Sequence, residues 1–269
     1  MLGKKLDVDF VVDRVLLTND DGFDAPGLKV LEQVAKTLAR DVWIVAPEKD
    51  QSGVSHAISL HSPIRITKRG FQCFAVTGTP GDCVMIAVRH LMLECLPDLI
   101  LSGINRGANL GVETVFSGTV GAAMVGLLLG FPSIALSQAF AAREDVPWET
   151  SSKLAGQTIR DLLKLNWEGS ACLNVNFPPC LPDQAKPLKL TSQGVGHLSG
   201  ADVIACRDPR EFSYYWLKLT HAERENVPCT EAMELGKCHI TASPLEFERT
   251  NEAVLERMCQ MYRPLAVQP

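Results

Sequence analysis

Polar segments follow three short apolar runs of the sequence, at the point where each run ends. They are residues 19–22 (Asn-Asp-Asp-Gly), 47–56, which contain Gln51-Ser52-Gly53, and 103–111 (Gly-Ile-Asn-Arg-Gly-Ala-Asn-Leu-Gly). If the runs are parallel strands, their carboxyl ends meet at one edge of the sheet, where the ligands of open α/β sheets bind. Two adjacent carboxylates, a hydroxyl and carboxamides would then converge, and such oxygen donors suit Mg²⁺, Mn²⁺ or Ca²⁺ far better than Zn²⁺. The pair Asp20-Asp21 alone fits a solvated turn equally well; the convergence of three loops favours a metal site.

The segment from Phe116 to Thr119 precedes a predicted helix and is a candidate anion site. Its backbone N–H groups and hydroxyls could hold an anion at the start of that helix. An ordinary N-cap formed by Ser117 or Thr119 would have the same sequence, and it is the simpler interpretation of this segment alone. A cation beside an anion pocket implies a phosphoryl substrate, and hydrolysis is the simplest reaction there. His56 could donate a proton to the leaving group, although a structural hydrogen bond is the commoner role of a loop histidine.

Other catalytic motifs are missing from the sequence. Cys83 and Arg89 have the spacing of cysteine phosphatases, but the five residues between them contain no glycine and form part of a predicted helix. The chain has no GxSxG, GxxxxGK or HExxH motif. Its nine cysteines are scattered and never spaced as a CxxC pair, which indicates reduced thiols and a cytoplasmic location rather than disulfides or a zinc site.

Composition places the chain among globular proteins. It has 269 residues, of which 46% are hydrophobic, and a formal net charge of −5. A nucleic-acid polymer is not an expected partner, because binding its phosphates needs an excess of Lys and Arg. Residues 120–136 carry no charge, but three glycines and Pro132 interrupt them. They are interpreted as a buried helix followed by a buried strand, so no membrane association is expected.

The elements that position these residues alternate between strand and helix. A strand at 14–18, a helix from Pro26 to about Arg40 and a strand at 42–46 form the parallel crossover of an α/β fold. The further predicted strands are 64–68, 71–76, 98–102, 133–137, 171–177, 212–219 and 239–242; the further predicted helices are 80–93, 118 onward, 148–165 and 252 onward. The strands at 64–68 and 71–76 are expected to form a hairpin through Arg69-Gly70. The predicted organisation is an N-terminal extension (1–13), a core with a mostly parallel sheet (14–188) and a C-terminal extension for oligomerisation (189–269).

Seven strings in order along the chain resemble the SurE family of stationary-phase survival proteins, which are divalent-metal-dependent 5'(3')-nucleotidases. They are LLTNDDGFDAPGL, IVAP, QSGVSH, TGTPGDCV, LILSGINRGANLG, FSGTVGAAM and GFPSIALS, and LNVNFP extends the series. The resemblance implies a Rossmann-like three-layer core with C-terminal elements that are exchanged between subunits of a homodimer or homotetramer. It also implies the release of phosphate from nucleoside monophosphates, with some 3'-nucleotidase and exopolyphosphatase activity.

The same resemblance assigns roles to residues of this sequence. One Mg²⁺ or Mn²⁺ per subunit, with Ca²⁺ as a further candidate, would be held by Asp20, Asp21, Ser52 and Asn105, and the catalytic residues would be Asp20, Asp21 and Asn105. The phosphate side of the site would be formed by Asn109, Ser117, Gly118 and Thr119, with Asn19 and Gly53 close by. The chain departs from the family at Arg106, where a small residue is expected; Arg106 would either touch the substrate phosphate or pair with an acidic neighbour. Residues 1–13 have no counterpart, and a histidine expected shortly after residues 243–247 is missing.

Two alternatives to a nucleotidase follow from the same residues. A receiver-like phosphoacceptor module also places an acidic pair after its first strand, but it needs an aspartate and a lysine at the ends of later strands. The corresponding positions here are Ser102 and Ser137. A metal-dependent phosphatase for sugar phosphates or polyphosphate is equally compatible with the sequence.

Overall fold

The computed structural model describes residues 10–142, 144–167, 169–222 and 227–262. Its strands are β1 (Val12–Thr18), β2 (Ala39–Pro47), β3 (Ile66–Gly70), β4 (Cys73–Val76), β5 (Leu99–Arg106), β6 (Ser133–Gln138), β7 (Cys172–Phe177), β8 (Lys186–Leu190), β9 (Leu198–Arg207), β10 (Ser213–His221) and β11 (His239–Leu245). Its helices are α1 (Pro26–Ala35), α2 (Pro80–Ile86), α3 (Gly118–Leu128), α4 (Trp148–Leu162), α5 (Glu231–Gly236) and α6 (Glu252–Met261), with a π-helical turn η1 (Ala87–Leu91) and a 3₁₀ turn η2 (Gly111–Val115).

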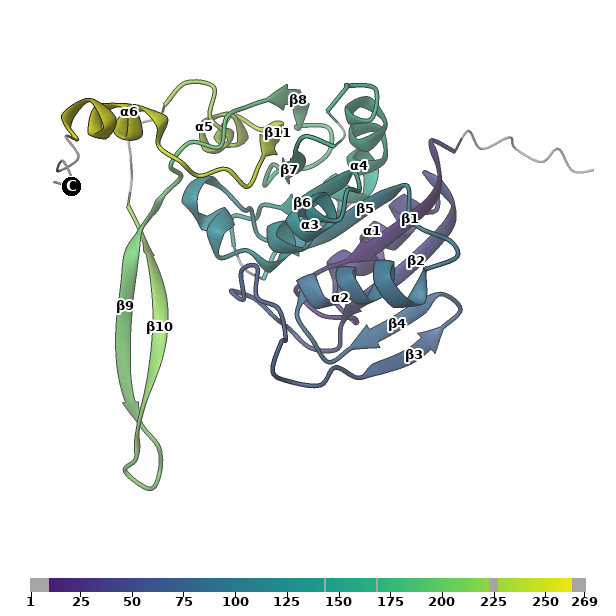
Figure 1. The fold of residues 1–269 in the computed structure, drawn as a ribbon, viewed down its shortest axis with the longest axis horizontal. Coiled ribbons are helices and arrows are strands. Elements are labelled where there is room, and N and C mark those ends of the chain that lie inside the picture. Colours follow the sequence, from purple (N-terminus) through teal and green to yellow (C-terminus); the bar gives the residue numbers. More distant parts are fainter. Residues whose placement is uncertain (1–9, 143, 168, 223–226, 263–269) are drawn as a thin grey trace, which may run out of the picture.

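A nine-stranded sheet forms the centre of the molecule, in the order β3-β4-β2-β1-β5-β6-β7-β11-β8 (Figure 1). The run from β4 through β2, β1, β5 and β6 to β7 is parallel. One apolar cluster joins this sheet to α1 and α4, and a second joins it to α2 and α3. The predicted α/β fold with a mostly parallel sheet between two helical layers is thus confirmed.

Helix α3 is almost entirely apolar because most of it is buried, while its last residue, Leu128, is exposed. Every residue from Gly118 to Gly126 is buried, and β6 follows it into the sheet. The interpretation of the uncharged segment as a buried helix and a buried strand is therefore confirmed. Within the described ranges, no helix is long and apolar enough to cross a membrane.

The predicted hairpin exists, but its turn is two residues further along the chain. β3 runs to Gly70 and β4 begins at Cys73, so the connection is Phe71-Gln72 and not Arg69-Gly70. Gln72 adopts φ +55°, and its side-chain Nε2 donates a 2.6 Å hydrogen bond to Asp41 of β2. Pairing of β4 with the neighbouring β2 sets this register, and the sequence of the turn alone does not reveal it.

The C-terminal part of the chain supplies a strand of the central sheet and also forms a ribbon outside it. β11 lies in the sheet between β7 and β8, antiparallel to β7. β9 and β10 form a separate two-stranded ribbon that projects away from the sheet in Figure 1. The boundary at 188/189 remains a prediction, although the segment after it supplies a core strand. Of the N-terminal segment, residues 1–9 lie outside the described residues, and β1 begins at Val12.

Candidate functional site

The loop after β1 and the loop after β2 are packed directly against each other. The backbone N–H of Gln51 donates to the carbonyl of Asp20 at 2.7 Å, which places Ser52 and Gly53 beside the acidic pair. Asn19 holds the first loop closed by donating from Nδ2 to the carbonyl of Gly22 at 2.8 Å. Gly22 has φ +98°, and a Cβ there would lie 3.1 Å from the carbonyl carbon of Lys49. This close approach explains why the loop has a glycine at that position.

β5 is longer than the sequence predicts and includes the start of the polar segment at 103–111. The predicted strand ends at Ser102, whereas the observed strand continues to Arg106 through an irregularity in its pairing with β6. Gly103 allows this path, because it has φ +139° and a Cβ there would lie 2.3 Å from the carbonyl oxygen of Leu136. The extension brings the backbone N–H of Arg106 within 3.0 Å of Asp21 Oδ2. The chain from β5 is thereby tied to the acidic pair after β1.

Asn105 is oriented so that its amide oxygen is available to a ligand. Its Nδ2 donates to the carbonyl of Gly107 at 2.9 Å, which leaves Oδ1 as the unused end of the side chain. Asn105 also lies next to Arg106, whose N–H binds Asp21. A neutral oxygen acceptor is thus carried by the residue that precedes the N–H bound to Asp21.

Asp20 is the anion at the start of α3. Its Oδ2 accepts from the backbone N–H of Thr119 at 3.1 Å, and its Oδ1 accepts from the Thr119 hydroxyl. Ser117 caps the helix by accepting from the N–H of Val120 at 3.0 Å. Thr119, one member of the segment predicted to bind a substrate anion, therefore binds a carboxylate of the protein. The Ser117 hydroxyl proton and the Gly118 N–H are the donors of this segment that could meet a substrate.

Burial destabilises the ionised forms of the Asp20 and Asp21 carboxylates, and a bound cation would offset this effect. Burial raises the pKa of Asp20 to about 6, which the hydrogen bonds from Thr119 oppose and the nearby charge of Asp21 reinforces. Burial also raises the pKa of Asp21, against the effect of the Arg106 N–H. A cation bound between them would favour both ionised forms.

Three further polar atoms, in or directly after β1 and β5, have no partner within the described part of the chain. They are Thr18 Oγ1, Asn19 Oδ1 and Ser102 Oγ, all in fully buried residues. Together with the carboxylates and Asn105 Oδ1, they give the site a donor set made of oxygen alone, with Ser52 as an exposed hydroxyl at its rim. No cluster of three His, Cys, Asp or Glu side chains occurs among the described residues. The donors therefore fit a hard divalent cation and do not fit Zn²⁺.

Both the backbone N–H and the backbone carbonyl of Asn109 form hydrogen bonds. Its N–H donates to Asn176 Oδ1 at 2.9 Å, and its carbonyl accepts from Asn174 and Asn176 at 2.9 and 3.1 Å. Its side-chain Nδ2 donates to Ser137 Oγ at 2.8 Å, so one amide proton remains for a substrate. These contacts fix Asn109 beside β6 and β7, close to the ends of both strands.

Glu231, which no sequence motif identifies, binds the chain just after Asn109. It is fully buried and accepts hydrogen bonds from the N–H of Gly111, from Asn174 Nδ2 and from the Ser243 hydroxyl. Gly111 follows the segment that carries Asn105 and Asn109. No local pattern could have identified Glu231, since it lies 120 residues away from Gly111 along the chain.

Substitution of Glu231 should change how stability depends on pH. Burial raises the pKa of Glu231 to about 7 from an ordinary value of 4.5. The folded protein therefore binds this proton more tightly than the unfolded chain, so stability falls as pH rises from about 4.5 to about 7, by at most about 3 kcal/mol. Glu231→Gln should lose less stability over this window, as measured by urea unfolding at pH 5 and pH 8 with EDTA present. Parallel pH profiles of the two proteins would contradict a shifted Glu231.

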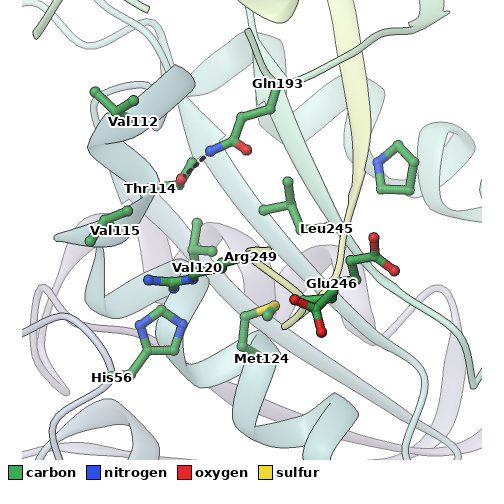
Figure 2. Close-up of a pocket in the computed structure, with 12 residues that line it drawn as sticks. His56, Val112, Thr114, Val115, Val120, Met124, Gln193, Leu245, Glu246 and Arg249 are labelled. Carbon is green, nitrogen blue, oxygen red and sulfur yellow. Dashed lines mark hydrogen bonds between the residues drawn. The ribbon is translucent and has the colours of Figure 1, made fainter. Parts of the chain in front are cut away.

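Two cavities flank the site. The first, of about 410 Å³, lies between η2, α3 and the segment after β11, and its lining includes His56 (Figure 2). The second, of about 330 Å³, is lined by Asp21, Arg106 and Trp148. Arg106 is thus beside acidic neighbours of the site, as one of its two predicted roles requires.

Comparisons with known proteins identify one family. A family model described as survival protein SurE matches residues 15–200. A protein of Burkholderia lata named 5'-nucleotidase SurE 1 is 57% identical over 246 residues, which are 91% of this chain and 95% of that protein. A 5'-nucleotidase SurE of a Bradyrhizobium species (strain BTAi1) is 46% identical over 244 residues, covering 89% and 96% of the two chains. The crystal structure of the SurE protein from Aquifex aeolicus superimposes with a TM-score of 0.78 at 33% identity, covering 92% of this chain and 99% of the other.

Proposed function

Because the chain belongs to the survival protein SurE family, we propose that it is a 5'-nucleotidase that uses one divalent cation per subunit to convert a nucleoside monophosphate into nucleoside and phosphate. The similar proteins of Burkholderia lata and Bradyrhizobium are both named 5'-nucleotidases. The observation that carries the proposal is the acidic pair after β1, to which the end of β5 is tied by the hydrogen bond from the Arg106 N–H to Asp21 and the start of α3 by the hydrogen bond from the Thr119 N–H to Asp20.

The proposed cation ligands are Asp20, Asp21, Ser52 and Asn105. Mg²⁺ and Mn²⁺ are the expected ions, and Ca²⁺ is a further ion that this oxygen set could bind. When bound, the cation would polarise a phosphoryl oxygen and lower the pKa of a nearby water. Ser52 is the exposed member of the set, so its contribution depends on how the turn at 51–53 sits beside Asp20.

The surrounding residues would bind and orient the phosphate. We assign this role to the Ser117 hydroxyl, the Gly118 N–H and the remaining amide proton of Asn109, with Asn19 and Gly53 at the edge. Thr119 would act through Asp20, which it holds with two hydrogen bonds. Donors that are fixed before substrate arrives stabilise developing charge without reorganising, which supports catalysis by this arrangement.

We do not assign His56 as the acid that protonates the leaving group. Burial lowers the pKa of His56, and the nearby charge of Arg249 lowers it further, so the ring is mainly neutral at pH 7. A neutral imidazole can still orient a substrate by donating one hydrogen bond. We therefore assign His56 a binding role in the first cavity.

Exposed apolar side chains support a homodimer or homotetramer. The ribbon of β9 and β10 exposes Val203, Trp216 and Leu217, and α6 exposes Met258 and Met261. Isolated ribbons with such faces are rarely left uncovered.

The cysteines are all free thiols, which supports a reducing compartment such as the cytoplasm.

The proposal is tested by measuring phosphate release from 5'- and 3'-nucleoside monophosphates, sugar phosphates and polyphosphate. EDTA should abolish release, and added Mn²⁺ or Mg²⁺ should restore it, fastest with nucleoside 5'-monophosphates. Faster release from sugar phosphates or polyphosphate would instead favour the general phosphatase. No release with either metal would contradict an enzyme and favour a phosphoacceptor module.

A further inference from the structure

A row of polar residues crosses the sheet from the acidic pair to the C-terminal strand β11. The residues that pair in register across β5, β6, β7 and β11 are Asn105, Ser137, Asn176 and Thr241. The last three of them are fully buried. Asn105 is a proposed cation ligand, and the next residue, Arg106, donates its N–H to Asp21. The row therefore leads from the proposed site to a strand that the C-terminal part of the chain supplies.

Asn109 is hydrogen-bonded to this row. Its Nδ2 donates to Ser137 Oγ at 2.8 Å, and Ser137 is the residue that pairs with Asn105. Its backbone N–H donates to Asn176 Oδ1 at 2.9 Å. The amide of Asn109 is thus connected, through one hydroxyl, to the strand position opposite the proposed cation ligand.

Glu231 holds the segment 109–111 at two points. Its Oε1 accepts from the backbone N–H of Gly111 at 2.5 Å, and its Oε2 accepts from Asn174 Nδ2 at 3.0 Å. The same Asn174 Nδ2 donates to the carbonyl of Asn109 at 2.9 Å. Asn174 and Glu231 are both fully buried, so water does not replace these contacts when one is lost. One carboxylate therefore binds Gly111 directly and Asn109 through Asn174.

The two contacts of Glu231 require an acceptor at each end of the side chain. The Gly111 N–H and Asn174 Nδ2 can only donate, and each faces a different oxygen of Glu231. A glutamine would have a single oxygen, so its Nε2 would face one of the two donors whichever way its amide turned. Asn174 could not adapt by turning its own amide, because its Oδ1 would then face the carbonyl of Asn109. Loss of the carboxylate must therefore break a contact of the segment 109–111.

The carbonyl side of Gly111 is also held by a residue that follows β8. Gln193 Nε2 donates to the carbonyl of Gly111 at 2.7 Å and to the Thr114 hydroxyl at 2.6 Å, the second of which is drawn in Figure 2. The N–H of Glu231 donates to the carbonyl of Ser192 at 2.9 Å, which joins the two parts of this support. The position of the segment 109–111 is thus set from outside the predicted core at 14–188.

We propose that Glu231 is a positioning residue for the phosphate-binding amide of Asn109, and that it acts through Asn174 and Gly111. The proposal deepens the nucleotidase function and rests on it, because that function assigns the Asn109 amide to the phosphate. Glu231 itself does not touch the substrate. Its loss should therefore weaken the binding of phosphate and leave the binding of the cation unchanged.

The test measures the Kd for inorganic phosphate by calorimetry, with Mg²⁺ present, at pH 8, where Glu231 is ionised because its pKa is about 7. Glu231→Gln should raise this Kd about tenfold and Asn109→Ala about thirtyfold, since hydrogen bonds to charged groups are strong. The double variant should match Asn109→Ala within twofold, because no amide remains to be positioned. The Kd for Mn²⁺ should change less than twofold in Glu231→Gln, which a general loss of structure would not allow.

A second variant tests the same connection with the carboxylate in place. Asn174→Ala removes the side chain that joins Glu231 to the Asn109 carbonyl. It should raise the Kd for phosphate about tenfold and should add nothing in the Asn109→Ala background. This variant decides the question if Glu231→Gln does not fold.

Glu234→Gln is the matched control, because Glu234 is a second buried carboxylate of α5 that binds Lys189 and Lys237 instead of the segment 109–111. It should change neither Kd. An unchanged phosphate Kd in Glu231→Gln, or independent effects that reach about three-hundredfold in the double variant, would overturn the proposal. So would wild-type protein that binds no phosphate. If wild type binds phosphate but releases none from AMP, the nucleotidase function fails, and the Kd values still decide the role of Glu231.

Discussion

Asp20→Asn should reduce kcat/KM for nucleoside monophosphates by about three orders of magnitude while leaving the protein folded. Asn keeps an oxygen that can accept from Thr119, but it removes the charge that a divalent cation needs. The loss of one anionic ligand of the cation is expected to cost several kcal/mol in the transition state, and about 4 kcal/mol corresponds to a thousandfold. Steady-state kinetics with saturating Mn²⁺ would measure this loss.

A thermal measurement separates this effect from misfolding. Burial and the charge of Asp21 raise the pKa of Asp20 to about 6, so its ionised form is an unfavourable group in the absence of a cation. The metal-free Asn variant should therefore melt at the same temperature as metal-free wild type or slightly higher at pH 8. Added Mn²⁺ should raise the melting temperature of wild type alone.

Asp161→Asn is the matched control, because Asp161 is an exposed carboxylate of α4 whose partners are Lys164 and Gln157. It should leave both the kinetics and the response to Mn²⁺ unchanged. If Asp20→Asn turns over substrate like wild type, the carboxylate pair is not the catalytic metal site.

Gly118→Ala should lower kcat/KM by about two orders of magnitude through a single methyl group. The added Cβ would lie 2.8 Å from Asp20 Cβ, 3.0 Å from Asp20 Oδ2 and 3.2 Å from Pro80 Cγ. These distances are too short, so Asp20 must move away from the start of α3 and lose its hydrogen bonds from Thr119. Overpacking of a buried site typically costs about 1–3 kcal/mol of stability. Kinetics and urea unfolding would record both effects.

Gly156→Ala tests whether a methyl group on a glycine of another helix has the same consequence. Its nearest neighbours would be 3.6 Å away, an ordinary contact, so the variant should keep full activity and gain up to about 1 kcal/mol of stability. Wild-type activity in Gly118→Ala would mean that the contact of α3 with Asp20 does not position a catalytic group.

Much of the fold could be predicted because a parallel α/β architecture follows from local patterns, namely short apolar runs that alternate with segments of helical periodicity. The helix predicted from Pro26 to about Arg40 ends at Ala35, because β2 begins at Ala39. The strands β1, β6 and β7 and the helix α4 lie within a few residues of their predicted bounds. Their alternation implies a parallel sheet, and a parallel sheet brings its carboxyl ends together. The turn of the β3–β4 hairpin and the end of β5 were misplaced, since both depend on pairing with strands that are distant in sequence.

The sequence by itself determined the chemistry available to this protein: oxygen donors after three strands, no cysteine or histidine spacing of a zinc site, and an acidic pair that could hold a cation. Only the tertiary structure decided how these groups are used. It turned the start of α3 toward Asp20 across 99 residues, placed Glu231 beneath Gly111, and opened a cavity between α3 and the segment after β11. The reason is physical: residue types and short periodicities are local properties, whereas burial, hydrogen-bond partners and cavities arise where segments far apart in the chain pack together.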